Sequence, residues 1–333
     1  MTRGDPTPLR SDPALGRVLV TGGMGFIGSN LVRRLDGLGA DVLVVDNLLD
    51  GQGGNPFNLH GASPRVRVLR HDLRDGAVLP GLLEGRDLVF NLAAQTSHLG
   101  SMTDPMTDLS INVTAQLQLL EACRRHAPRA RVVFASTRQV YGEARRLPVD
   151  ETHPTHPLDV NGWNKLVAEG YHQLYHRVYG LRTTVLRLTN TYGPRMRVRD
   201  ARQTFVGAWI GRAVRGEPFE VWGGEQLRDL CQVDDLVDAF VAATAPALEG
   251  GVYNVGGASA VTLRELADVL ARVSGGGYEI RPFPAERKRI DIGDFHADDT
   301  LFRSLTGWRP RIGLEAGLRA AVDYYREHLA HYA

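Results

Sequence analysis

Short apolar runs alternate with helix-like segments along the first part of the chain. Six runs of strand length are rich in β-branched residues, and between them apolar positions recur with a helical period. The runs are RVLV, DVLVVD, RVRVLR, DLVFNLAA, RVVFAS and TTVLRL, and they begin at residues 17, 41, 65, 87, 131 and 183. This alternation predicts an α/β fold of the Rossmann type, a doubly wound parallel sheet with helices on both faces.

Helical patterns separate these runs, and three of them are long enough to cover a sheet. They span residues 26–38, 104–126 and 161–179. The second opens with Asp104 and Pro105, and five of its positions form one apolar stripe. The stripe consists of Leu109, Val113, Leu117, Leu120 and Cys123.

The pattern changes after Arg195. Short strands such as FEVW and VYNVGG mix with helices near 204–215, 234–245, 263–273 and 314–329. We therefore divide the chain into a tail at 1–15, a Rossmann domain at 16–193 and a smaller C-terminal α+β lobe at 194–333. Segments of that lobe can return to the sheet.

The first strand leads into three glycines with the spacing G-x-x-G-x-x-G, at Gly22, Gly25 and Gly28. A strand that passes through such glycines into a helix leaves bare backbone N–H groups at the positive end of the helix dipole. Phe26 and Ile27 belong to the same turn. The motif predicts a cradle for the diphosphate of a dinucleotide, and a glycine-rich turn without a ligand is the alternative.

The second strand ends in Asp46, about twenty positions after the glycines, and Asn47 follows it. A carboxylate at this place suits a hydrogen bond to the adenosine ribose and repels a 2′-phosphate. The segment 47–52 contains no arginine that would accept such a phosphate. The pattern therefore favours NAD over NADP as the cofactor.

Two further strand ends contribute to the predicted cofactor site. Strand three leads to Asp72 and Leu73, where the carboxylate either accepts a bond from the adenine amino group or caps the next turn. Strand four delivers Ala93, Ala94 and Gln95 to the carboxyl edge of the sheet, where doubly wound folds bind ligands.

Composition narrows the class of protein. The formal net charge of +1 gives no electrostatic reason to expect a nucleic-acid partner, and no apolar run reaches bilayer length. The chain begins without the apolar stretch of a signal peptide, so we expect a cytoplasmic protein without a membrane anchor. The two cysteines lack metal-ligand spacing, and we expect no metal site.

Nearly all basic residues are arginines, and the lysines are Lys165 and Lys288. A lysine in such a chain indicates a place that needs a compact ammonium group, with chance as the alternative.

Seven motifs, taken in order, resemble those of the extended short-chain dehydrogenase/reductase family, specifically the nucleotide-sugar epimerases and dehydratases. They are TGGMGFIG, LAAQTS, FASTRQVYG, LRLTNTYGPR, LRDLCQVDD, YNVGG and LTGWRP. The resemblance implies a bound NAD, a nucleotide-diphosphate sugar in the cleft and transient oxidation of a sugar hydroxyl. It also implies a homodimer formed through the helices near 104–126 and 161–179.

The same resemblance assigns substrate contacts. Asn190 and Arg228 match residues that meet the substrate diphosphate, and a second basic contact corresponds to either Arg287 or Lys288. Ser97, in the polar segment after strand four, lies near the expected reaction centre.

Two departures from the family pattern concern catalysis. The Asp-Glu pair of the dehydratases is replaced by Arg138 and Gln139, and neither side chain can exchange the proton that water elimination requires. The Tyr-x-x-x-Lys motif reads Asn161 to Lys165, so the catalytic tyrosine is absent, although the lysine and Thr137 remain.

An amide cannot remove the hydroxyl proton, so another base must lie in the cleft. His98 is our first candidate because it follows strand four on the same sheet edge as Thr137, which would orient the hydroxyl. Tyr141, His156 and Asp159 are the other candidates, and a purely structural histidine is the alternative for His98.

The sequence therefore predicts an NAD-dependent, epimerase-like enzyme with an altered acid/base group. A net oxidoreductase or other sugar-modifying enzyme is one alternative. A catalytically silent protein that binds NAD and a nucleotide sugar is the other. Asn161 favours either silence or altered chemistry, whereas the intact cofactor cradle, Thr137 and Lys165 favour a working redox site.

Overall fold

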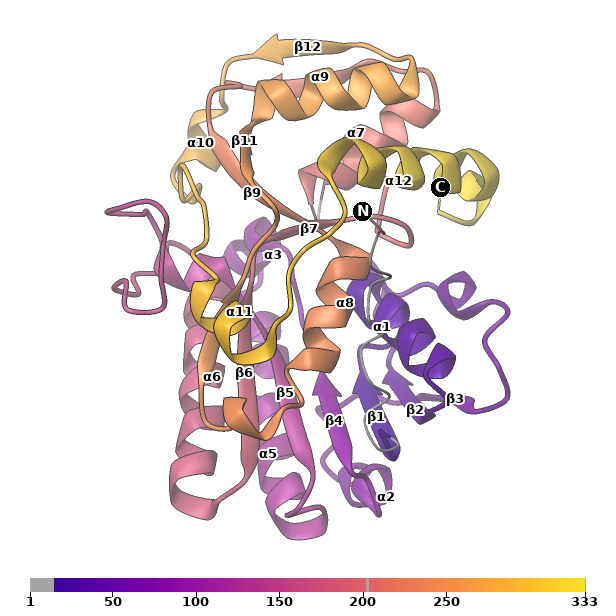
Figure 1. The fold of residues 1–333 in the computed structure, drawn as a ribbon, viewed down its shortest axis with the longest axis vertical. Coiled ribbons are helices and arrows are strands. Elements are labelled where there is room, and N and C mark those ends of the chain that lie inside the picture. The colour runs from indigo at the N-terminus through magenta and orange to yellow at the C-terminus, as the bar shows by residue number, and fades with distance from the viewer. Residues whose placement is uncertain (1–14, 202–203, 333) are drawn as a thin grey trace, which may run out of the picture.

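The computed structural model describes residues 15–201 and 204–332, so nearly all of the predicted tail at 1–15 lies outside the described residues. Within these ranges one seven-stranded sheet has the order β10-β6-β5-β4-β1-β2-β3, and every neighbouring pair of strands is parallel (Figure 1). Its strands are β1 (Arg17–Thr21), β2 (Asp41–Asp46), β3 (Val66–Arg70), β4 (Leu88–Asn91), β5 (Arg131–Thr137), β6 (Arg182–Leu188) and β10 (Val252–Val255). The predicted Rossmann-type fold is confirmed.

The strand order reverses at β1, which pairs with β2 on one side and with β4 on the other. The loops that follow β1 and β4 therefore run in opposite directions, and this opens a crevice at the carboxyl edge of the sheet.

Alternate residues of the central strands pack on opposite faces, as a parallel sheet covered on both sides requires. Val18 and Val20 belong to a core with α1 (Phe26–Gly37) and α8 (Val233–Ala242). Leu19 belongs to a second core on the other face. The helices of that face are α2 (Leu79–Leu83), α5 (Ala115–His126) and α6 (Val160–Tyr179).

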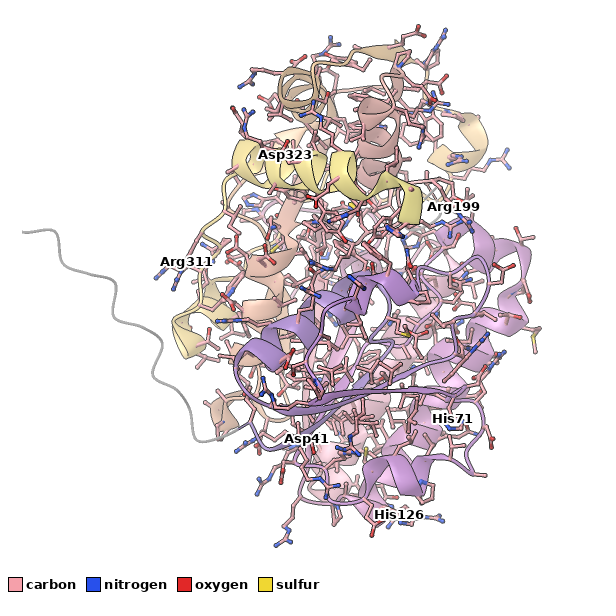
Figure 2. All side chains as sticks on the ribbon, turned by 90° about the vertical axis from the view of Figure 1, so that its right-hand side faces the viewer. Asp41, His71, His126, Arg199, Arg311 and Asp323 are labelled. Atoms are coloured by element: carbon pink, nitrogen blue, oxygen red, sulfur yellow. The ribbon has the colours of Figure 1, made fainter. Side chains whose placement is uncertain are left out.

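The edge strand β3 is mostly exposed. In Figure 2 Asp41, at the start of β2, and His71, directly after β3, mark the two ends of this edge of the sheet. His71 lies at the carboxyl end, where it lines the crevice.

The predicted helix at 104–126 is not continuous. It follows α3 (His98–Thr103) and consists of α4 (Pro105–Leu109), a π-helical turn at Ser110–Thr114, and α5. The extra residue of a π-helical turn offsets the faces before and after it. Leu109 at the start of the predicted stripe is consequently exposed, whereas Leu120 and Cys123 at its end are buried.

Helix α6 carries two of the predicted catalytic positions, and its ends have clear local causes. The carboxylate of Asp159 accepts a hydrogen bond from the Gly162 N–H at 2.6 Å and caps the first turn. Gly180 ends the helix in the left-handed conformation, with a φ of 70°. Asn161 and Lys165, four residues apart, therefore lie on one face of the first two turns.

Most of the remaining elements form the upper part of Figure 1. A three-stranded sheet combines β7 (Asn190–Tyr192), β9 (Leu227–Gln232) and β11 (Ala260–Thr262), and β8 (Phe219–Trp222) pairs with β12 (Tyr278–Arg281). The helices here are α7 (Phe205–Val214), α9 (Leu263–Ser274), α10 (Ala285–Lys288) and α12 (Leu314–His328), whereas α11 (Thr300–Thr306) lies lower, at the level of α8. The domain boundary at 193/194 stays a prediction.

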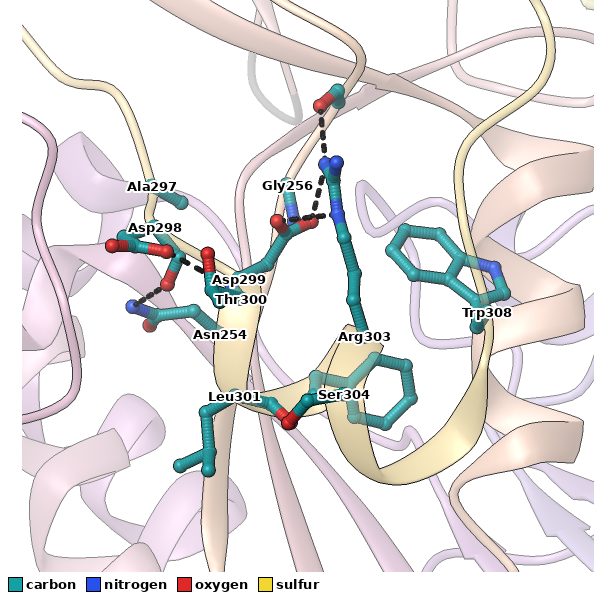
Figure 3. A network of polar contacts seen from close by, with 12 residues as sticks. Asn254, Gly256, Ala297, Asp298, Asp299, Thr300, Leu301, Arg303, Ser304 and Trp308 are labelled. Carbon is teal, nitrogen blue, oxygen red and sulfur yellow. Dashed lines mark hydrogen bonds and ion pairs between the residues drawn. The ribbon is translucent and has the colours of Figure 1, made fainter.

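One strand after position 194 joins the main sheet, because β10 pairs with β6. A polar network shown in Figure 3 ties this strand to α11. The Asn254 amide donates to the Asp298 carbonyl at 3.1 Å, and the Gly256 N–H donates to Asp299 at 3.3 Å. Arg303 pairs with the same Asp299 carboxylate at 2.6 Å.

Across both described ranges, we find no helix with the length and apolar content needed to span a bilayer.

Candidate active site

The glycine motif forms the tight turn between β1 and α1. Gly22 has a φ of 68°, and a Cβ added to it would lie 2.8 Å from the Ala93 nitrogen. A Cβ on Gly28 would collide with the carbonyl oxygen of Gly22. Gly25 precedes α1, and no side chain of the described residues caps that helix. The first backbone N–H groups of α1 are therefore available to an anion.

This turn is one wall of a cleft at the carboxyl edge of the sheet. All of the predicted cofactor residues except Gln95 line it. They are Gly22, Gly25, Phe26, Ile27, Gly28, Asp46, Asn47, Asp72, Leu73, Ala93, Ala94 and Lys165. Gln95 is buried beside the cleft, where its side-chain amide donates to the Ser97 carbonyl at 3.1 Å.

The two acidic residues of the cofactor end differ in their electrostatics. Asp46 accepts backbone hydrogen bonds from Met24 at 3.0 Å and Leu48 at 2.9 Å, and burial raises its pKa. Asp72 caps the next turn by accepting from the Arg74 N–H and pairs with the Arg74 guanidinium at 2.6 Å, which lowers its pKa far below the usual range. The capping role considered for Asp72 is therefore present, and the same residue also lines the cleft.

Thr137 and Lys165 approach the cleft from β5 and α6. Thr137 ends β5 and its hydroxyl oxygen accepts from the Gln139 N–H at 3.2 Å. Lys165 donates to the Ala135 carbonyl at 2.9 Å and lies over the Phe134 ring. Burial lowers the pKa of Lys165 to about 8, against an opposing effect of Asp108 and Glu169.

Asn161 also reaches the cleft wall, and both N–H groups of its amide are occupied by hydrogen bonds. Its Nδ2 donates to the Gln95 carbonyl at 2.8 Å and to Asp108 at 3.1 Å. The buried Asp108 carboxylate also accepts from Asn112 and Asn164. Asn161 is thus part of a network that satisfies a buried charge, and its amide has no acid/base function.

His98 lies at the start of α3 and lines the cleft from the side of β4. Its Nδ1 lies 2.8 Å from an oxygen of Asp159, whose side chain is 2% exposed, whereas that of His98 is 36% exposed. The contact is close but does not have the geometry of a hydrogen bond. A carboxylate beside Nδ1 favours a proton on that nitrogen, which leaves Nε2 as the acceptor. The structure therefore brings together two of the predicted base candidates as a pair.

The other two candidates do not line the cleft. Tyr141 is completely buried, its hydroxyl donates to Asn254 at 2.7 Å, and burial raises its pKa to about 12. Its assignment as a catalytic residue was wrong, because it is part of the core beneath the site. His156 is exposed, and its carbonyl packs against Gly142.

Only some of the residues predicted to bind the substrate line the cleft. Thr137 and Asn190 line the cleft, whereas Ser97 caps α3 by accepting from the Gly100 N–H. Arg228 is buried away from the cleft lining, where it pairs with Asp291 at 2.9 Å.

The two remaining basic candidates also lie outside the lining of the cleft. Arg287 stacks on the Trp222 ring at 4.7 Å, and Lys288 is exposed. Their role as phosphate contacts stays a prediction, and so does the choice between them.

A family profile described as "NAD dependent epimerase/dehydratase family" matches residues 18–256, which is well over half of the chain. The chain belongs to this family. The resemblance inferred from the seven motifs is confirmed, and so is NAD as the cofactor.

Curated relatives and solved structures agree with this assignment. A UDP-glucose 4-epimerase of Mycolicibacterium smegmatis is 34% identical, covering 93% of this chain and 98% of its own. UDP-glucuronic acid decarboxylase 2 of Arabidopsis thaliana is also 34% identical, over 94% of this chain and 69% of its own.

Two structures of UDP-glucose 4-epimerases are each 33% identical to the chain and cover 99% of their own length. The Thermotoga maritima enzyme with UDP-glucose has a TM-score of 0.84 and covers 94% of this chain. The Thermus thermophilus enzyme with NAD has a TM-score of 0.82 and covers 93%.

The residues present fit the cofactor of this family of enzymes. The α1 N-terminus and the close approach at Gly22 and Gly28 suit a pyrophosphate, and Asp46 suits an adenosine ribose. Lys165 and Thr137 line the same cleft, and the assignment of Lys165 to the nicotinamide end stays a prediction.

The sequence did not reveal that Asp159 lies beside His98 or that Asp108 accepts hydrogen bonds from Asn161 and Asn164. The spacing Asp159-x-x-Gly162 indicates only a helix cap, and nothing local shows that the same carboxylate faces His98. Asp108 stands in an ordinary helical stretch, and only the packing of α4 against α6 brings it to Asn161 and Asn164.

Proposed function

We propose that this protein is a nucleotide-sugar epimerase that oxidises a sugar hydroxyl transiently, with His98 and Asp159 replacing the tyrosine of the family motif. The observation that carries the proposal is the 2.8 Å distance between His98 Nδ1 and Asp159, at the wall of a cleft that Thr137 also lines. The relatives act on UDP-glucose or UDP-glucuronic acid by name, which supports a nucleotide sugar as the substrate.

In the proposed mechanism, the proton of the sugar hydroxyl moves to His98 and later returns to the sugar. Asp159 keeps the imidazole oriented, the Nε2 of His98 takes the proton of the sugar hydroxyl, and Thr137 holds that hydroxyl by a hydrogen bond. When bound, NAD supplies the acceptor and later the donor of the hydride. The same imidazolium then returns its proton to the oxygen of the epimerised sugar, which leaves the enzyme unchanged.

Lys165 contributes a buried positive charge on the nicotinamide side of the cleft. Its ammonium group is held by the Ala135 carbonyl, so its position is fixed before ligands bind. Asn161 supports the wall without exchanging protons. Water elimination is disfavoured because Arg138 and Gln139 line the cleft where the dehydratase motif has acids.

A second candidate is a silent binder of NAD and a nucleotide sugar. The observation that favours it is that the Asn161 NH₂ group donates to both Gln95 and Asp108. The network gives the position a structural role that would persist without catalysis.

The deciding experiment is incubation of the NAD-loaded protein with UDP-, GDP- and dTDP-linked hexoses and hexuronates in deuterated water, with products identified by NMR. Epimerisation by hydride return gives an epimer without deuterium at the changed carbon, and His98→Asn abolishes it. A dehydrated sugar, or NADH formed stoichiometrically with an oxidised sugar, would contradict the epimerase. Binding without any change of substrate would establish the silent binder.

We also propose that the protein is a cytoplasmic homodimer built on the segments 104–126 and 161–179, which contain α4, α5 and α6. Large apolar side chains on these helices are exposed, among them Met106 and Leu109 on α4 and Trp163 and Val167 on α6. Trp163→Glu should convert the dimer to a monomer in size-exclusion chromatography with light scattering. Leu301→Glu, at a similarly exposed site on α11, should not. A monomeric parent protein would contradict the proposal.

A further inference from the structure

Four residues that line the cleft have a buried polar atom without a hydrogen-bond partner among the described residues: His98, Arg138, Gln139 and Asn190. The His98 Nδ1 lies at ion-pair distance from Asp159, whereas Nη1 of Arg138, Oε1 of Gln139 and Oδ1 of Asn190 have no polar side chain assigned to them. A buried polar group without a partner costs free energy, so a cluster of such groups indicates that a ligand completes their bonding.

Arg138 forms no ion pair among the described residues, although the carboxylates of Asp291 and the buried Asp229 act on its charge from nearby. Its guanidinium lies over the Phe295 ring at 5.3 Å, and Arg228 is a second positive charge that acts on it. Asp291 is already paired with Arg228. Burial, with a smaller contribution from Arg228, lowers the pKa of Arg138 to about 9. An anion beside Arg138 would relieve this penalty.

The pattern of donors and acceptors describes the ligand more closely. Arg138 offers charged N–H groups, which favour an oxyanion such as a carboxylate or phosphate. Gln139 and Asn190 offer amide oxygens, which require O–H or N–H donors. A diphosphate is an acceptor at neutral pH and leaves both oxygens without a partner. A sugar acid carries a carboxylate and several hydroxyl donors and satisfies all three groups.

The position in the chain indicates which part of a substrate meets this cluster. Arg138 and Gln139 directly follow Thr137, which holds the sugar hydroxyl in the proposed mechanism, so we assign them to the sugar end of the cleft. We propose that Arg138 is a specificity-determining residue that binds a carboxylate on the sugar, and that the amide oxygens of Gln139 and Asn190 accept hydroxyls of the same sugar. The amide NH₂ of Asn190 stays available for the diphosphate contact that the family resemblance implies. The substrate class is then a nucleotide-linked hexuronate, a choice that rests on the nucleotide-sugar function proposed above.

The test is isothermal titration of the NAD-loaded protein with acidic and neutral pairs of ligands. The pairs are UDP-glucuronate with UDP-glucose and GDP-mannuronate with GDP-mannose, and UDP and GDP alone report the diphosphate contribution. The parent protein should bind the acid of one pair about 10- to 100-fold more tightly than its neutral partner. Arg138→Met should remove this preference, and Arg138→Lys should restore part of it.

Matched measurements separate the possible failures. Arg309→Met removes the same charge from an exposed position and should leave the preference intact, and NAD binding reports whether each variant is folded. Equal loss of UDP-glucose, UDP-glucuronate and UDP binding in Arg138→Met would assign the anion to the diphosphate and overturn the hexuronate. An unchanged preference in Arg138→Met would overturn the role of Arg138. Failure of the parent to bind any nucleotide sugar would overturn the proposed function as well.

Discussion

Replacing Asp159 with asparagine should separate the stability of α6 from the chemistry of His98. One carboxylate oxygen accepts from the Gly162 N–H at 2.6 Å, and the other lies 2.8 Å from His98 Nδ1. An asparagine can keep the first contact through its carbonyl oxygen, and asparagine and aspartate are equally good helix caps. Its NH₂ group then faces Nδ1, so the imidazole must carry its proton on Nε2, where it can no longer accept one.

The expected magnitudes differ strongly between the two properties. Asp159→Asn should change the free energy of unfolding by less than about 0.5 kcal/mol, whereas Asp159→Ala should lose about 1 kcal/mol with the cap. Both variants should lose about 100- to 10,000-fold in kcat, the usual contribution of a general base. Adding His98→Asn to Asp159→Asn should cost little more, because the two residues act as one unit.

Three measurements check this reasoning. Urea unfolding gives the stability, turnover of the nucleotide sugar found in the panel gives kcat, and ¹⁵N NMR of the imidazole shows which nitrogen carries the proton without any substrate. Near-normal turnover of Asp159→Asn, or fully additive losses in the double variant, would refute the assignment of the pair.

Three further predictions concern residues of the predicted NAD site. NAD should raise the Tm and NADP at the same concentration should not, because Asp46 lines the cleft where we expect the adenosine ribose and its carboxylate would repel a 2′-phosphate. Equal shifts would count against this role. Burial lowers the pKa of Lys165 from 10.5 to about 8, so the unfolded chain binds more protons between these values and the free energy of unfolding should rise with pH across them. Lys165→Met should abolish that rise in urea unfolding at about pH 7 and about pH 10, and a parallel rise in both proteins would exclude this cause. Gly28→Ala should weaken NAD binding at least about 10-fold because its methyl group collides with the Gly22 carbonyl, whereas Gly37→Ala in the same helix meets no atom within 4 Å and should bind NAD normally.

Much of the fold followed directly from the sequence, because its causes are local. The period of the apolar residues places each strand and most helices, and the glycine spacing fixes a turn whose backbone few other residues can adopt. The cofactor site follows from the same features, since parallel strands bring their carboxyl ends to one edge of the sheet. The family motifs supplied the chemistry expected at that edge.

The catalytic end depended on the tertiary structure. Nothing near Asp159 in the chain shows that its carboxylate faces His98, nothing near Arg228 shows that Asp291 neutralises it, and the apolar stripe at 104–126 gives no sign of the π-helical turn. Tyr141 reads like a loop residue near the site and is instead buried in the core. Periodicity and turn chemistry act over a few residues and can be read along the chain. Side-chain pairs between distant positions exist only once the elements have packed, because small rotations of each helix decide which groups meet.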